Sequence, residues 1–198
     1  MGTALAWSWL DVATTLLVGF CALLRPTEYL PVCFRDQALP CEHAAGLFLF
    51  VGVPCHKTSR RGPRRTHVRV DEPTVVEFLR WRAGRLPSWM PIYSGSATTW
   101  RRRLDILTRT LTGKSRLILP SSLRPGAATY FFEAWGENVP KLQWRGRWQC
   151  TKTLEHYIQE LVPYRILAEV APTLRDRLET LANMFDETLL EVMGRNPA

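Results

Sequence analysis

Apolar residues recur at helical spacing along most of this chain, which limits it to a mainly helical fold. The clearest series runs from Trp9 to Leu24, and Pro26 then makes Arg25 the expected boundary of that helix. Proline, glycine and serine residues divide the rest of the chain into further segments. No segment recurs with the 20–50-residue period of a repeat protein. The further helices are expected at about 73–84, 97–111, 122–135, 137–146, 151–162 and 164–193.

One short region has the pattern of strands instead. Leu47 to Val53 is an apolar run of strand length, and Thr66 to Val70 alternates between polar and apolar residues. A basic segment separates the two runs, which is typical of a β-hairpin with a charged tip. The whole pattern predicts a mainly α domain with a small antiparallel β-sheet, an α+β fold. The basic residues of the tip are Lys57, Arg60, Arg61, Arg64 and Arg65.

The positive charge of the chain is carried almost entirely by arginine. The formal net charge is +8, and 22 of the 26 basic residues are arginines. A guanidinium group grips phosphate oxygens with two parallel hydrogen bonds, whereas lysine acts as a mobile point charge. The composition therefore indicates a phosphate or nucleic-acid partner and excludes an acidic disordered chain.

The cysteines and the N-terminal segment argue against secretion and against a membrane protein. Five scattered cysteines without a Cys-x-x-Cys pair predict reduced thiols in a nuclear or cytoplasmic protein. Cys41 with His43, and Cys55 with His56, lack the usual zinc spacing, so no metal or cofactor is expected. The apolar N-terminal segment is interrupted by Asp11 and predicts a buried helix rather than a membrane span.

Four separated segments hold residues suited to phosphate chemistry. An apolar helix leads to Arg25 and Glu28, and the hairpin tip holds Lys57. Leu119-Pro-Ser121-Ser-Leu-Arg124 starts a helix with an arginine. Trp148 then precedes Tyr157 by nine residues, in Trp148-Gln-Cys-Thr-Lys-Thr-Leu-Glu-His-Tyr157.

This order and spacing resemble the catalytic domain of the tyrosine recombinases, the phage-integrase family. That family has Arg-x-x-Glu after an apolar helix, a lysine in a β-hairpin and a His-x-x-Arg helix start. A Gly-His turn follows, with tryptophan for histidine in some members, and the nucleophilic tyrosine comes nine residues later. The resemblance extends over about residues 5–165, with no counterpart of the N-terminal DNA-clamping domain of most relatives. It implies the DNA breaking-rejoining catalytic fold.

The resemblance implies a role for each matching residue. Arg25 and Arg124 would hold the non-bridging oxygens of the scissile phosphate, and Tyr157 would attack phosphorus to form a 3′-phosphotyrosyl link. Lys57 would protonate the 5′-hydroxyl leaving group, and Trp148 would pack or donate its indole N–H. Glu28 would orient Arg25 or its neighbours.

Three departures from the family pattern keep a second interpretation open. Ser121 takes the position of the motif histidine, Pro125 and Gly126 follow Arg124, and Arg147 stands where a glycine is expected. An active enzyme for DNA recombination or integration and a catalytically inactive DNA-binding remnant of a mobile element both fit. A third alternative, an unrelated basic protein that binds RNA or a partner, predicts that Arg25, Arg124 and Tyr157 do not converge.

The expected partner is double-stranded DNA, and the family acts as four protomers on two duplexes. The arginines expected to contact the DNA backbone, besides those of the hairpin tip, are Arg101, Arg102 and Arg103. We expect residues 1–163 to form the catalytic domain and 164–198 a C-terminal helix. The apolar stripe of that helix could pack on a neighbouring subunit or on its own core, and the sequence leaves both open.

Overall fold

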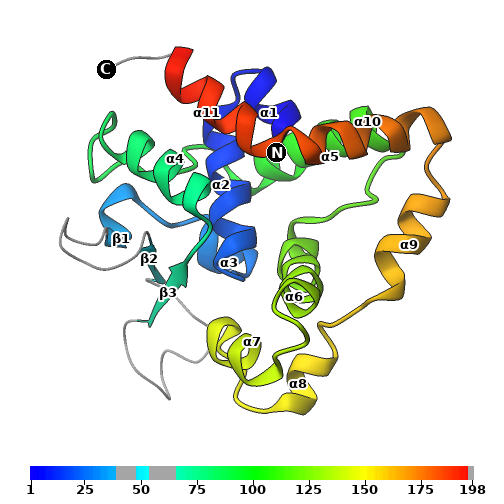
Figure 1. The fold of residues 1–198 in the computed structure, drawn as a ribbon. Helices are drawn as coiled ribbons and strands as arrows, with labels where there is room; N and C mark the ends of the chain where they lie inside the picture. The colour runs from blue at the N-terminus through cyan, green and yellow to red at the C-terminus, as the bar shows by residue number, and fades with distance from the viewer. Residues whose placement is uncertain (39–47, 54–65, 196–198) are drawn as a thin grey trace.

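The computed structural model describes residues 1–38, 48–53 and 66–195. Helices dominate, and a small antiparallel sheet lies at one side (Figure 1), as the helical spacing predicted. The helices are α1 Gly2–Ala6, α2 Leu10–Cys21, α3 Pro26–Tyr29, α4 Pro73–Ala83, α5 Ala97–Thr112, α6 Leu123–Ala134, α7 Val139–Gly146, α8 Thr151–Glu155, α9 Leu161–Ala168, α10 Pro172–Asn183 and α11 Phe185–Arg195, with single 3₁₀ turns at Phe34–Asp36 and Pro120–Ser122.

The two predicted strands pair as expected. Strand β2, Leu49–Val53, runs antiparallel to β3, Thr66–Val70, and Val51 lies opposite Val68. Alternate side chains of both strands are buried in the core, which is why the apolar residues recur at every second position. The two-residue strand β1, Gln37–Ala38, pairs with β2 and was not predicted. The residues that connect β2 to β3, with Lys57 and the tip arginines, lie outside the described residues.

Helix α2 is the centre of the larger of two hydrophobic cores. Nine of its twelve residues are buried, among them Gly19, against which α6 packs. The sheet, α1, α4, α5 and α11 also contribute to this core, and the Ser96 side chain caps α5 by accepting a hydrogen bond from the Thr99 N–H. A second, smaller core joins Leu23 to α6, α7 and α8. The candidate site lies where these two cores meet.

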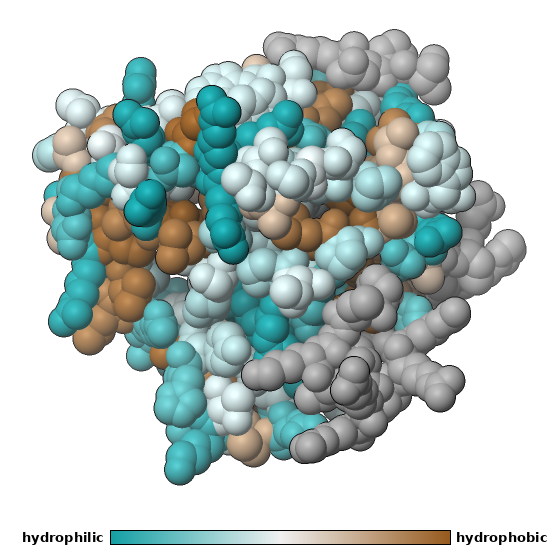
Figure 2. Space-filling model, turned by 180° about the vertical axis from the view of Figure 1, so that it is seen from behind, coloured by the Kyte–Doolittle hydropathy of each residue, from teal (hydrophilic) through white to brown (hydrophobic). Residues whose placement is uncertain are grey.

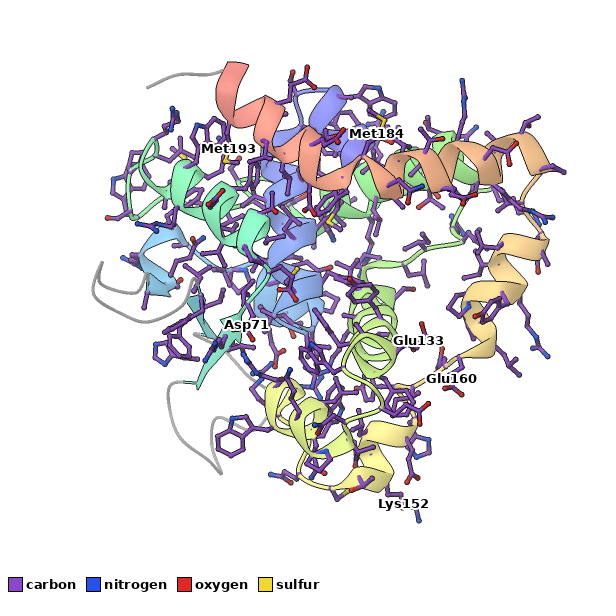
Figure 3. The ribbon with its side chains drawn as sticks, viewed as in Figure 1. Asp71, Glu133, Lys152, Glu160, Met184 and Met193 are labelled. Carbon is purple, nitrogen blue, oxygen red and sulfur yellow. The ribbon has the colours of Figure 1, made fainter. Side chains whose placement is uncertain are left out.

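The single helix predicted over 164–193 is wrong. The structure divides this segment into parts of α9, α10 and α11, because Pro172 starts α10 and disfavours a helical conformation at Ala171. Met184, labelled in Figure 3, separates α10 from α11. Helix α11 packs on α4 and α1, with Leu189 fully buried, so this end of the chain packs on its own core.

Helix α9 lies apart from the other helices in Figure 1 and leaves most of its apolar residues exposed. Figure 2 shows apolar side chains gathered at the left edge of the opposite view, the side on which α9 lies. Within the described part of the chain, no helix combines the length and the apolar character needed to cross a membrane. The exposed apolar residues of α9 are Leu161, Val162, Tyr164 and Leu167.

Candidate active site

Glu28 is a buried carboxylate shared by three arginines. Its side chain is 1% exposed, and its Oε2 accepts hydrogen bonds from Arg147 Nη2 at 2.8 Å and from Arg124 Nη1 at 3.4 Å. Its Oε1 lies 3.3 Å from Arg25 Nη1, and its Oε2 also caps the Arg25 backbone N–H. Burial alone would raise the pKa of Glu28, but Arg147, the Arg25 N–H and Arg124 outweigh burial and lower it.

Helix ends hold the Arg124 guanidinium in place. Its Nη1 donates to the Leu23 carbonyl at 2.8 Å, just past the end of α2, and its Nη2 donates to the Gly146 carbonyl at 2.6 Å, at the end of α7. Carbonyls at helix C-termini carry partial negative charge and favour a cation. Burial first, and then the neighbouring Arg25 charge, lower the pKa of Arg124 to about 10, so the group remains cationic at neutral pH.

A buried hydrogen-bond chain fixes the relative positions of three elements of the site. Trp100 Nε1 of α5 donates to the Tyr29 hydroxyl of α3 at 3.0 Å, and that hydroxyl donates to the Pro120 carbonyl at 3.1 Å. Burial raises the pKa of Tyr29 to about 12, so the phenol keeps its proton. The chain thereby ties the helix of Arg25 and Glu28 to the turn that leads into Arg124.

Tyr157 and Trp148 lie against Arg124. The Arg124 guanidinium carbon is 4.7 Å from the Trp148 ring centre and 5.4 Å from the Tyr157 ring centre, and the two rings are 5.1 Å apart. The predicted helix over 151–162 ends at Glu155, so Tyr157 lies in a turn rather than in a helix. Its backbone N–H donates to the Leu154 carbonyl, and the Thr129 hydroxyl bridges the Tyr157 carbonyl and the Gln159 N–H.

Three donors of this cluster are buried without a hydrogen-bond partner among the described residues. They are Trp148 Nε1, Arg124 Nε and Arg147 Nε. An unpaired buried donor costs about 1–3 kcal/mol, so such groups are uncommon in folded proteins. All three belong to side chains that contact Glu28 or Arg124, so the unpaired donors lie where positive charge is concentrated.

Gly146 allows Trp148 to approach this cluster. A Cβ atom at Gly146 would lie 1.6 Å from the Trp148 ring, so no other residue fits without moving the indole. We expect Gly146→Ala to lower the free energy of unfolding by at least about 1–3 kcal/mol, measured by urea denaturation, because it overpacks the core. The matched control is Gly126→Ala in α6, where a Cβ meets nothing within 4 Å. An unchanged stability for Gly146→Ala would contradict this packing.

The remaining predicted residues lie beside the cluster or outside the described residues. Ser121 is exposed and lines a pocket of about 790 Å³ together with Pro26, Arg101 and Arg102. Arg103 faces elsewhere: it pairs with Asp11 at 2.7 Å and lies over the Trp9 and Tyr93 rings, so its expected role as a DNA contact has no support here. Outside the described residues lie Lys57, Arg60, Arg61, Arg64, Arg65, Cys41, His43, Cys55 and His56.

The sheet is tied to the site through α7. Arg145 donates to Asp71 and to the Arg69 carbonyl at the end of β3, where Figure 3 labels Asp71. Strand β3 therefore lies next to α7, the helix that leads to Trp148. In the described ranges, no cluster of three or more metal-ligating side chains occurs.

Three residues that help to build the candidate site were not predicted from the sequence. Arg147 was read only as a departure from the family's glycine, although the structure joins it to Glu28. Gly146 and Tyr29 carry no motif, and only a three-dimensional contact reveals their roles. The sequence signal that could have identified Arg147 is its place immediately before Trp148, where it adds positive charge beside a predicted site residue.

The sequence was also compared with known proteins. Neither the protein-family models nor the curated proteins contain a match to this chain.

Proposed function

We propose that this chain is a tyrosine-recombinase-like catalytic domain that cuts and rejoins duplex DNA through Tyr157. The observation that carries the proposal is one cluster built from three segments far apart in the sequence: Arg25 and Arg124 both pair with Glu28, and Trp148 and Tyr157 lie against Arg124. The third alternative, a basic protein unrelated to this chemistry, required these residues to point into different regions.

The proposed reaction is a transesterification. The Tyr157 phenol loses its proton to solvent, its oxygen bonds to phosphorus, and the P–O5′ bond breaks. Arg25 and Arg124 stabilise the charge on the non-bridging oxygens as phosphorus becomes pentacovalent. The 5′-oxygen takes a proton, for which Lys57 is the expected donor. The bond energy is kept in the 3′-phosphotyrosyl link, so rejoining needs no further energy source and no metal or cofactor is part of this scheme.

DNA would lie over the basic pocket that adjoins the cluster. Arg101 and Arg102 are exposed on α5, and Arg116 lies across the same pocket. We expect Arg101→Gln and Arg102→Gln each to reduce the slope of log affinity against log salt by about 1, measured on duplex DNA of mixed sequence. Arg103→Gln is the adjacent control and should leave the slope unchanged, since Arg103 is paired with Asp11. Equal slopes for all three variants and the wild type would contradict DNA binding on this face.

Assembly on DNA is part of the same proposal. The family's four-protomer arrangement would need surfaces for neighbouring protomers, and the exposed apolar residues of α9 offer one. Sedimentation of the protein with and without DNA would report such an assembly.

Covalent capture tests the proposed function. Purified protein is incubated with a pool of nicked duplexes of randomised sequence, and adducts that survive denaturation are collected. We expect recovered DNA to be joined to protein through its 3′ end. Duplex binding with no adduct in any sequence would instead favour the second interpretation, an inactive DNA-binding remnant in which Ser121 has ended catalysis.

A further inference from the structure

The cluster around Glu28 contains more positive charge than its own carboxylate can offset. Arg25, Arg124 and Arg147 each form an ion pair with Glu28, and in the described ranges none of them pairs with a second acid. Three guanidinium groups against one carboxylate leave an excess of two positive charges. Burial and the nearby Arg25 and Arg147 charges lower the pKa of Arg124, as expected of cations held together without enough anions.

Arg147 is the least expected member of this group. Its backbone has φ 60° and ψ 38°, a left-handed conformation that glycine adopts freely and other residues adopt at a cost. Glu28 already has two arginine partners, so neutralising it does not require a third. A strained residue that adds repulsion is better explained by an anion that binds at this place.

The position of the Arg147 side chain suits such a contact. Arg147 Nη2 and Arg124 Nη1 donate to the same Glu28 oxygen, so the two guanidinium groups adjoin. Arg147 is 18% exposed, whereas Arg124 is 2% exposed. Arg147 therefore reaches toward the surface beside Trp148, whose indole N–H is unpaired.

We infer that Arg147 is a third catalytic arginine, which contacts a non-bridging oxygen of the scissile phosphodiester and supplies the charged donor that Ser121 cannot. This inference rests on the proposed function and deepens it. Arg147 donates hydrogen bonds to oxygen as negative charge builds, and it transfers no proton because a guanidinium group does not deprotonate at neutral pH.

The first test compares two substrates. Cleavage rates of the wild type, Arg147→Gly and Arg147→Lys are measured on a duplex sequence recovered by covalent capture. The same duplex with a neutral methylphosphonate at the cleaved position is the second substrate. Glycine relieves the left-handed backbone and removes only the side chain. We expect Arg147→Gly to cleave the phosphodiester ~10²–10³ times more slowly and to approach the wild-type rate on the methylphosphonate. Equal losses on both substrates, or no loss, would overturn the inference.

The second test does not depend on cleavage. Inorganic phosphate should raise the melting temperature of the wild type more than that of Arg147→Gly, because Arg147 would contribute to binding the anion. Arg145→Gln is the control, since Arg145 pairs with Asp71 outside the cluster and should leave the phosphate response unchanged. Identical responses of the wild type and Arg147→Gly would overturn the inference. A reduced response in a protein that forms no adduct would support the anion contact and refute the proposed function alone.

Discussion

Replacing Glu28 with glutamine should lower the free energy of unfolding by about 3–5 kcal/mol, because it removes one partner of a buried ion-pair network. Glutamine keeps the shape of the side chain and can still accept from the Arg25 N–H, so the loss reports the charge. Urea denaturation measures it. Glu169→Gln is the matched control: its carboxylate pairs with Lys114 on the surface, and we expect little change. A small loss for Glu28→Gln would mean that the three arginines do not depend on this carboxylate.

The same substitution has a defined pH dependence. The pKa of Glu28 in the folded protein lies below its ordinary value of 4.5. The ionised carboxylate therefore contributes stability above pH 4.5, and this contribution is lost as the pH falls toward the lower native value. Glutamine does not titrate, so the stability gap between wild type and variant should narrow on acidification below pH 4.5. A constant gap would contradict the lowered pKa.

Tyr157→Phe should abolish covalent capture of DNA while leaving the fold and duplex affinity unchanged. Phenylalanine keeps the ring that packs on Trp148 and Arg124. Among the described residues, the hydroxyl of Tyr157 has no hydrogen-bond partner that the substitution would break. The variant therefore separates a nucleophile from a packing residue. Measured by denaturing gel of protein and labelled duplex, an adduct that persists in Tyr157→Phe would exclude this residue as the nucleophile.

Local signals made much of the fold readable from the sequence. Pro26 marked the boundary at Arg25, and the alternation of Thr66 to Val70 marked a strand. Each of these depends on backbone chemistry within a few residues, which a sequence displays directly.

Features that depend on tertiary contacts were not readable. Arg124 was predicted as a site residue at a helix start, but its partners were not, because only the fold brings the carbonyls of Leu23 and Gly146 to its guanidinium group. The break at Pro172 was overlooked because the apolar stripe continues through it, although proline disfavours a helical residue before it. Arg147 was interpreted as a departure from the family pattern, and only the structure shows its ion pair with Glu28.

The most direct test of the central claim is to find which atom of the protein becomes linked to DNA. Randomised duplexes carrying a 5′-bridging sulfur are suited to this, because the sulfur leaves without a proton donor and bypasses Lys57. After capture and proteolysis, mass spectrometry should identify a single modified peptide in which Tyr157 carries a 3′-phosphonucleotide. DNA linked to any other residue, or duplex binding without any linked peptide, would contradict the account.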